Sequence, residues 1–359
     1  MPENNLEDYG LEERFKQEAS MYEGLLLARV CEQHHQIYKV ITQQGELQAS
    51  ASGKLAYNAE DGMDFPAVGD WVMVGVQDGN TENAVIHHIL RRKSAFARKA
   101  AGTAISTQIV AANIDLVFIC MSLNADFNLR RLERYLAIAW ESRAAPVIVL
   151  TKADLCEDLQ QKLDQIETVS VGADVVVCSS MQEDGYKSVK SYLAPGKTIA
   201  FIGSSGVGKS TLINRLMGRD FLATREVCLG DDRGRHATTH RQLLLLPEGG
   251  VVIDTPGLRE IQIYVGDLAR AFQDIEELAV TCRFRDCSHT SEPGCAVQEA
   301  VQAGQLAEKR LENYVKLKTE TEYNGLNSRQ LEQEKIKKMF GSKGEMKQAL
   351  RNVKKKNSY

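Results

Sequence analysis

Short apolar runs recur through the middle of the chain, and each one ends in polar or glycine residues. A short apolar run bounded in this way is typical of a strand buried in a parallel sheet. The runs cover residues 147–150, 175–178, 198–202 and 251–253. A helical pattern begins at Ser210, shortly after the third run. This alternation predicts an α/β domain whose strands deliver polar side chains to a site.

The two ends of the chain follow different patterns. At the front, five short strand-like runs alternate with turns, at residues 24–30, 37–41, 47–55, 71–76 and 84–90. Repeated short strands at this spacing predict a small closed β-barrel. Near the other end, Leu306, Leu311, Tyr314 and Leu317 recur at helical spacing. They predict a helix within residues 305–322 that packs on the segment before it.

A glycine-rich loop joins the run 198–202 to the helical pattern that follows. It reads Gly203, Ser204, Ser205, Gly206, Val207, Gly208, Lys209, Ser210 and Thr211. Glycines let the backbone turn tightly and aim its N–H groups, together with a helix N-terminus, at phosphate oxygens. Lys209 adds a positive charge near the β- and γ-phosphates, and the Ser210 hydroxyl suits Mg²⁺. A chance glycine-rich turn is the alternative, and the flanking strand and helix argue against it.

The run 251–253 ends in Asp254, Thr255, Pro256 and Gly257. The Asp254 carboxylate can hold Mg²⁺ directly or through water, and Gly257 lets an amide N–H approach the γ-phosphate. A strand that simply ends in a Pro-Gly turn is the alternative. Downstream of a phosphate loop, we favour the magnesium interpretation.

The nucleobase is predicted from Thr151, Lys152, Ala153 and Asp154, which follow the run 147–150. A carboxylate at Asp154 can accept hydrogen bonds from N1 and N2 of guanine, and adenine offers no matching donors. Leaving it unpaired against adenine costs on the order of several kcal/mol, so GTP is favoured over ATP. Lys152 would lie along the nucleotide. The backbone of Ser179 and Ser180, after another strand, could contact the guanine O6; an ordinary loop is the alternative.

The order of these elements is the reverse of the usual one, because the guanine-reading segment precedes the phosphate loop. Such an order suggests one nucleotide pocket built from a rotated sequence, and it resembles the circularly permuted GTPases. With residues 111–115, 131–136 and 234–239, the chain resembles the RsgA/YjeQ family from about residue 21 to about residue 320. The resemblance implies a GTPase that acts on the small ribosomal subunit late in its assembly, and it implies that the barrel is an OB-fold.

Two positions depart from the usual GTPase pattern. The family's guanine motif usually begins with Asn, and Thr151 stands there, with a hydroxyl that can still tie neighbouring loops together. Leu258 stands where many GTPases place the glutamine that orients the attacking water, and leucine cannot do that. The resemblance implies that His236 helps to orient the attacking water instead. A surface histidine without a catalytic role is the alternative. Thr239, or else Thr238, is the candidate for sensing γ-phosphate through Mg²⁺. The expected catalytic residues are therefore Lys209, His236 and Thr239.

Composition is that of an ordinary globular protein. The chain has 359 residues, of which 43% are hydrophobic and 26% charged, with a net charge of −4. Because no apolar stretch is long enough for a membrane span and the N-terminus lacks a basic, apolar export signal, we expect a cytoplasmic protein without membrane contact. Eight cysteines in such a chain argue against a disulfide scaffold.

Three of those cysteines lie close together with a histidine. Cys282, Cys287, His289 and Cys295 fall within fourteen residues, among turn-forming residues. Three thiolates and an imidazole make a tetrahedral Zn²⁺ shell, and the spacing also matches the zinc motif of the family that the chain resembles. With all four positions filled by protein, the zinc ion is expected to be structural. Four unrelated loop residues are the alternative.

We therefore expect four segments: an N-terminal extension at 1–20, a barrel at 21–96, a permuted P-loop GTPase domain at 97–275, and a mainly helical zinc-binding domain at 276–359. Several basic or aromatic residues could contact RNA, with core packing or a solvated surface as the alternative. They are Tyr38, Lys39, Lys54 and Trp71 on the barrel, Arg91, Arg92, Lys93, Arg98 and Lys99 in the linker, and the lysine-rich tail after Lys335.

The function expected from these features is hydrolysis of GTP to GDP and phosphate, stimulated by the small ribosomal subunit. The expected partners are that subunit with its rRNA, and GTP or GDP, and the protein is expected to act as a monomer. A GTP-driven clamp, in which barrel and zinc domain grip RNA, is our mechanical hypothesis. Two alternatives are a module that holds GTP but hardly hydrolyses it, and a permuted GTPase that serves the large subunit or another RNA.

Overall fold

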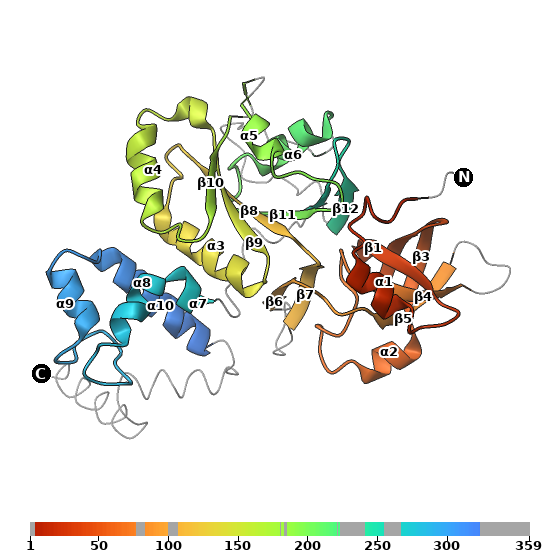
Figure 1. Cartoon of the computed structure of the whole chain (residues 1–359), viewed down its shortest axis with the longest axis horizontal. Coiled ribbons are helices and arrows are strands. Elements are labelled where there is room, and N and C mark those ends of the chain that lie inside the picture. The colour runs from red at the N-terminus through yellow and green to blue at the C-terminus, as the bar shows by residue number, and fades with distance from the viewer. Residues whose placement is uncertain are drawn as a thin grey trace, which may run out of the picture.

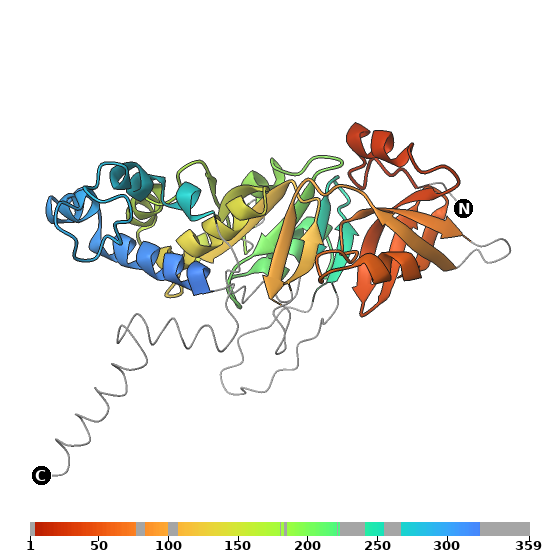
Figure 2. The same cartoon turned by 90° about the horizontal axis from the view of Figure 1, so that it is seen from below.

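The computed structural model describes residues 4–76, 83–99, 107–179, 181–182, 185–220, 222, 241–254 and 267–323. Three units lie in a row, with the β-barrel at one end, an α/β unit in the middle and a helical unit at the other end (Figures 1 and 2). Within these residues, no helix combines the length and the apolar character that crossing a membrane requires.

The N-terminal barrel is closed by five strands. They are β1 (Leu26–His34), β2 (Ile37–Thr42), β3 (Gly45–Ala51), β4 (Trp71–Val76) and β5 (Asn83–Ile89). The strands follow the order β1-β2-β3-β5-β4 and return to β1, with only β3 and β5 parallel. Ser52 caps helix α2 (Gly53–Asn58), because its hydroxyl accepts the N–H of Leu55. The predicted small closed barrel is confirmed.

Tyr38 and Trp71 belong to the interior of this unit. Tyr38 is 2% exposed among the apolar side chains inside the barrel, and Trp71 is fully buried. The Trp71 ring lies 5.8 Å from that of Phe15, on helix α1 (Glu13–Ala19), which covers the barrel from outside. The prediction that these two rings stack on RNA is therefore wrong. Lys39 is paired with Glu46 at 2.6 Å, whereas Lys54 is exposed and has no ion pair within the described residues.

The middle unit is a mainly parallel sheet. Its strands are β8 (Leu116–Ser122), β9 (Ala145–Thr151), β10 (Asp174–Val177), β11 (Thr198–Ile202), β12 (Arg241–Leu245) and β13 (Val251–Asp254). Their order is β10-β9-β8-β11-β13-β12, and only β12 runs antiparallel to its neighbour β13. Strand β11 is buried throughout, and β8 and β9 are buried after their first residue, as continuous apolar runs predict.

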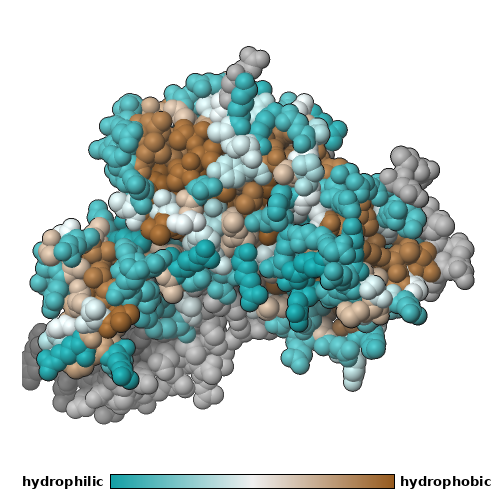
Figure 3. Space-filling model, in the orientation of Figure 1, coloured by the Kyte–Doolittle hydropathy of each residue, from teal (hydrophilic) through white to brown (hydrophobic). Residues whose placement is uncertain are grey.

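Helices and a small hairpin complete the middle unit. The helices are α3 (Leu129–Glu141), α4 (Leu159–Glu167), α5 (Lys187–Lys190) and α6 (Lys209–Met217), with a 3₁₀ turn η1 at Ala153–Leu155. Strands β6 (Ala95–Lys99) and β7 (Thr107–Ala112) pair as a separate hairpin. Strand β10 forms one edge of the large sheet, and Figure 3 shows an apolar area over α4 and β10.

The C-terminal unit consists of α7 (Leu268–Ala271), α8 (Gln273–Ala279), α9 (Ala296–Gln302) and α10 (Glu308–Tyr323). Helix α10 confirms the helix predicted within residues 305–322, and Tyr314 packs beside His289 at 6.2 Å between ring centroids. A buried ion pair fastens α10 to α3, because Arg310 Nη1 donates to the fully buried Glu133 at 2.7 Å. The predicted basic tail lies outside the described residues.

The barrel and the middle sheet are joined by backbone pairing and by a buried arginine. β1 pairs with β12 through Glu32 and Gln242, and through Gln33 and Arg241. Arg29, 1% exposed, donates to the carbonyls of Gly69 at 3.3 Å and Asn113 at 3.4 Å, to the carbonyl of Tyr9, and to Thr198 Oγ1 at 2.9 Å. Burial lowers the pKa of Arg29 to about 10, which leaves it charged at neutral pH.

Two cations of the predicted basic linker form ion pairs within the protein, near the junction between the barrel and the middle sheet. Arg92 pairs with the buried Asp70 at 2.7 Å, and Lys93 pairs with Asp115 at 2.8 Å and also contacts Glu12. Burial raises the pKa of Asp115, but the charge and hydrogen bond of Lys93 outweigh it, so that this pKa is lowered overall. The expectation that Arg92 and Lys93 face RNA is therefore not supported by their contacts.

Replacing Arg29 with Met should destabilise the protein, because the side-chain volume stays similar while buried oxygen acceptors lose their donor. We expect a loss of about 2–3 kcal/mol in the free energy of unfolding. Urea unfolding followed by tryptophan fluorescence reports on this site, since Arg29 lies 5.4 Å from the Trp71 ring. Arg91→Met, at an exposed position in the same region, should change the free energy by less than about 0.5 kcal/mol. Equal effects of the two variants would contradict the role given to Arg29.

Candidate functional site

The polar residues predicted to bind nucleotide follow the carboxyl ends of neighbouring strands. β9, β8, β11 and β13 are parallel neighbours, so their carboxyl ends meet at one edge of the sheet. Thr151 ends β9, the loop at 203–208 follows β11, and Asp254 ends β13. Ligands of open α/β sheets bind at this edge.

The glycine loop runs between β11 and α6. Gly203 has φ 142°, and a Cβ at this position would lie 2.4 Å from the Cys120 carbonyl oxygen of β8. Only glycine therefore allows the loop to pass this close to the neighbouring strand. The Lys209 ammonium donates to the carbonyls of Gly203 at 2.6 Å and Ser204 at 2.5 Å, so the lysine head lies over the loop. Ser210 and Thr211 follow in the first turn of α6.

Arg131 is a contact of this loop to which the sequence pattern assigned no role. It lies on α3, where Nη1 donates to the Ser204 hydroxyl at 2.5 Å and to Asp126 at 2.9 Å. The guanidinium therefore places a second cation beside the phosphate loop. The two residues are 73 positions apart, and no local pattern indicates that they meet.

The guanine-reading segment is fixed by two hydroxyl groups. Thr151 Oγ1 donates to the carbonyl of Val207 in the phosphate loop at 2.5 Å. The Ser179 hydroxyl, after β10, donates to Asp154 Oδ1 and so orients that carboxylate. Lys152 adopts a left-handed backbone conformation, with φ 57°, between the strand and the turn that carries Asp154. Thr151 thus ties the base-reading strand to the loop that would hold the phosphates.

Several predicted site residues fall outside the described part of the chain. They are Ser180, His236, Thr238, Thr239, Thr255, Pro256, Gly257 and Leu258. The roles predicted for them stay predictions. Asp254 is half-buried at the end of β13, where it pairs in register with Gln242 of β12.

The cysteine and histidine residues predicted to bind metal lie together in the helical unit. The ligand atoms of Cys282, Cys287, His289 and Cys295 all lie within 4.8 Å of one another. Cys295 Sγ lies 3.4 Å from His289 Nδ1 and 3.9 Å from Cys282 Sγ. Zinc bonds of about 2.3 Å to sulfur and 2.0 Å to nitrogen give tetrahedron edges of about 3.8 Å and 3.5 Å. The cluster therefore has the size and the ligands of a site for one metal ion.

The strand order, the phosphate loop at 203–208 and the guanine-reading segment after β9 define a P-loop GTPase whose elements are circularly permuted. Residues 89–264 match the family model described as RsgA GTPase. The chain is 54% identical to "Small ribosomal subunit biogenesis GTPase RsgA 2" of Lactiplantibacillus plantarum over 96% of this chain and 97% of that protein. It is 41% identical to a protein of the same name from Vibrio parahaemolyticus, over 90% and 87% of the two chains. The chain belongs to the RsgA GTPase family.

Solved structures agree with this fold. The crystal structure of YjeQ from Thermotoga maritima superposes with a TM-score of 0.59 at 29% identity, covering 83% of this chain and 98% of that one. A structure titled as YloQ, a circularly permuted GTPase, superposes with a TM-score of 0.57 at 24% identity, covering 84% and 96%. These likenesses confirm the permuted GTPase fold expected from the order of the motifs.

Replacing Thr151 with Val should weaken nucleotide binding, because the shape is kept while the Val207 carbonyl loses its donor. We expect the dissociation constant of GDP to rise about five- to ten-fold. Titration with a fluorescent GDP derivative measures it. Thr168→Val, at an exposed residue whose hydroxyl donates to the Gln165 carbonyl of the same helix, is the matched control. Thr151→Asn supplies an amide donor and should bind GDP as the wild type does. Weak GDP binding by this variant would contradict the role given to the Thr151–Val207 hydrogen bond.

Proposed function

We propose that this protein is a GTPase that binds the small ribosomal subunit and assists its late assembly in the cytoplasm, with GTP hydrolysis stimulated by the subunit. The hydrogen bond from Ser179 to Asp154 is the main support for guanine nucleotide binding, because it orients the carboxylate of the guanine-reading segment. The ribosomal part is supported by the relatives, whose names state small ribosomal subunit biogenesis. We propose a monomer as the active form.

Guanine selection follows from the donors that each base offers. Ser179 donates to one oxygen of Asp154, and the carboxylate retains acceptor capacity for the N1 and N2 hydrogens of guanine. Adenine presents no such pair of donors, so its binding would leave the carboxylate unpaired. Lys152 and the residues at 179–180 would complete the base site.

Hydrolysis requires that phosphate charge be neutralised and that a water molecule be oriented. We propose Ser210, Asp254 and Thr239 as the residues that would hold Mg²⁺, which would neutralise phosphate charge when bound. The amides of the loop at 203–208 and Lys209 would bind the phosphate oxygens, with Gly257 close to the γ-phosphate. We propose that His236 orients the attacking water, since Leu258 lacks a polar group for that task.

The clamp hypothesis gains a physical basis from two short connections. β12, which pairs with the barrel, begins directly after the segment that contains Thr239, and α7 begins shortly after the segment that contains Gly257. Both outer units are therefore attached to residues proposed to sense the γ-phosphate. We propose that the barrel (21–96) and the zinc domain (276–359) flank the GTPase domain (97–275) and respond to its nucleotide.

Phosphate release from GTP should be slow with the protein alone and should accelerate at least ten-fold with small ribosomal subunits, because the partner completes the site. The measurement compares separated small and large subunits at equal concentration. Lys209→Ala should abolish the release in every mixture, which shows that the activity comes from this protein. Equal rates of phosphate release with and without small subunits would favour a module that holds GTP but hardly hydrolyses it. Faster release with large subunits would favour a GTPase that acts on the large subunit.

Asp154→Asn should lower the affinity for GTP by about a hundred-fold, because an amide replaces one of the two acceptors with a donor. Xanthosine triphosphate has an oxygen where guanine carries its amino group, so the variant should bind it more tightly than the wild type does. Competition against a fluorescent GTP derivative measures both affinities. Asp164→Asn, an exposed carboxylate on α4, is the control and should leave the preference unchanged.

We propose that the cysteine and histidine cluster holds one structural zinc ion. Elemental analysis should find one zinc per chain, and Cys295→Ser should abolish it, since Cys295 is 2% exposed and lies within the ligand set. The variant should also gain protease cleavage sites within residues 282–295, because the metal orders that loop. Cys156→Ser, outside the cluster, should keep its zinc. A full zinc content in Cys295→Ser would contradict the assignment.

A further inference from the structure

Ser204, the second residue of the phosphate loop, lies between two cations. Its carbonyl accepts the Lys209 ammonium at 2.5 Å, and the Gly203 carbonyl beside it accepts the same ammonium at 2.6 Å. Its hydroxyl accepts Nη1 of Arg131, from helix α3, at 2.5 Å. One half-buried residue therefore connects the lysine expected at the phosphates to an arginine of another element.

The direction of the Lys209 ammonium depends on these two carbonyls. A lysine side chain has a long, flexible stem, and the hydrogens of its ammonium rotate together. Hydrogen bonds to two fixed acceptors restrict the orientation of the whole group. The Ser204 peptide thus helps to decide where the positive charge would meet the β- and γ-phosphates. Whatever holds Ser204 in place therefore orients Lys209 as well.

Arg131 is itself held by the loop that precedes helix α3. Asn128 caps the helix, because its Oδ1 accepts the Arg131 N–H at 3.1 Å. Asp126 accepts Arg131 Nη1 at 2.9 Å, and Asn124 Oδ1 accepts the Asp126 N–H at 3.1 Å. This loop follows β8, the parallel neighbour of the strand that leads into the phosphate loop. The two loops therefore lie side by side, and the one before α3 is hydrogen-bonded into a support for Arg131.

The other side of helix α3 is fastened to the helical unit. Glu133 is fully buried, and it accepts Arg310 Nη1 at 2.7 Å and Asn313 Nδ2 at 2.5 Å, both from helix α10. In the phosphate loop, by contrast, Ser205 and Gly206 are exposed. Helix α3 is therefore a rigid base, from which an arginine can hold a more exposed loop.

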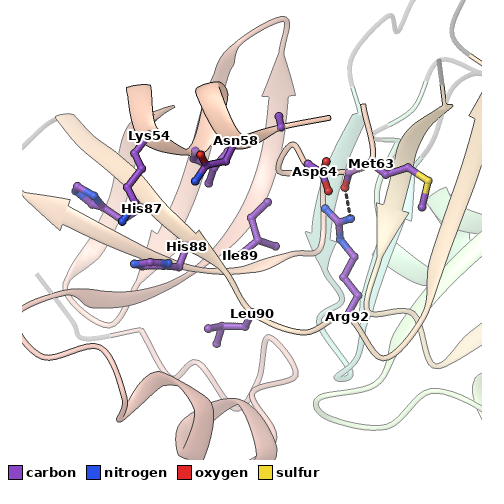
Figure 4. Close-up of a pocket in the computed structure, with 11 residues that line it drawn as sticks. Lys54, Asn58, Met63, Asp64, His87, His88, Ile89, Leu90 and Arg92 are labelled. Carbon is purple, nitrogen blue, oxygen red and sulfur yellow. Dashed lines mark hydrogen bonds between the residues drawn. The ribbon is translucent and has the colours of Figure 1, made fainter. Parts of the chain in front are cut away.

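Arg131 uses its donors differently from an arginine that fastens the fold. Arg92 engages all three guanidinium nitrogens, with Asp70 at 2.7 and 2.8 Å and with the carbonyls of Met63 at 2.6 Å and Phe65 at 2.8 Å. Figure 4 shows the bond from Arg92 to Met63. Among the described residues, the Arg131 guanidinium is bonded through Nη1 only, and its side chain is 32% exposed. Such a contact contributes little to fold stability, so the bond to the loop hydroxyl points to a functional role.

We propose that Arg131 is a positioning residue for GTP hydrolysis, which holds Ser204 through its hydroxyl and thereby orients the Lys209 ammonium toward the phosphates. The inference rests on the proposed phosphate role of Lys209, and it names what orients that lysine. In this role Arg131 contacts the loop and not the nucleotide. Phosphoryl transfer requires positive charge at fixed positions, so a displaced ammonium should lower the rate of hydrolysis more than the affinity for nucleotide.

The test is single-turnover hydrolysis of GTP by an excess of the full chain without ribosomal subunits, beside titration with a fluorescent GDP derivative. Arg131→Met keeps the apolar stem and removes the donors, and it should lower the rate about ten-fold and weaken GDP binding about three-fold. Ser204→Ala removes the acceptor and should have the same effects. The double variant should be no slower than Arg131→Met alone. Arg143→Met, exposed just after the other end of α3, is the matched control.

Asp126→Asn separates positioning of the loop from a simple ion pair, because it removes the carboxylate charge and leaves the bond between Arg131 and Ser204. It should lower the rate by less than about two-fold. An unchanged rate in Arg131→Met, or equal losses in Arg131→Met and Asp126→Asn, would overturn the proposal. A slow Arg131→Met beside a normal Ser204→Ala would overturn it in favour of direct contact between Arg131 and phosphate.

Lys209→Ala is measured in the same series, because the inference depends on that lysine. Hydrolysis by Lys209→Ala at the wild-type rate would contradict the proposed role of Lys209 and the inference with it. Loss of hydrolysis in Lys209→Ala together with an unchanged rate in Arg131→Met would overturn only the inference. Since no ribosomal subunit is present, these results do not depend on the proposed partner.

Discussion

Parallel hydrogen bonding between β9, β8, β11 and β13 decides where the polar residues of the nucleotide site lie. Ile148 of β9 pairs with Ile119 of β8, and Ile119 pairs with Ile202 of β11, all of them fully buried. A slip of one residue would turn these side chains to the opposite face, so burial fixes the register. Because the site depends on this register and not on chain order, a rotated sequence can build the same purine site.

The two outer units are attached to this sheet by charged groups that are removed from water. Arg29 joins the barrel to the middle unit through backbone carbonyls and Thr198, whereas Arg310 joins the helical unit to α3 through Glu133 at 2.7 Å. Buried charges tolerate little displacement, since losing a partner leaves the other uncompensated. Relative movement of the three units would therefore either break these buried contacts or have to move both partners of each contact together.

Much of the fold was predictable because it depends on local pattern. The apolar runs at 147–150 and 198–202 became β9 and β11, and the order of the motifs indicated the permuted fold. Contacts between distant segments were not predictable in this way. Because side chains alternate along a strand, Trp71 and Val72 point to opposite faces of β4. The sequence cannot show that α1 covers the face on which Trp71 lies. The partners of Arg92, Lys93 and Arg131 are likewise remote in sequence, so their charges could not be assigned from composition.

The pairing of β1 with β12 makes the barrel and the GTPase sheet one hydrogen-bonded surface. A β-ladder is stiff along its strands, and its pairing can change only in whole-residue steps. Displacement of the chain just before Arg241 would therefore be passed to the barrel as a rotation of the whole unit or would break the ladder outright. The barrel and β12 would therefore move as one body, so that the orientation of the barrel depends on the position of the sheet edge.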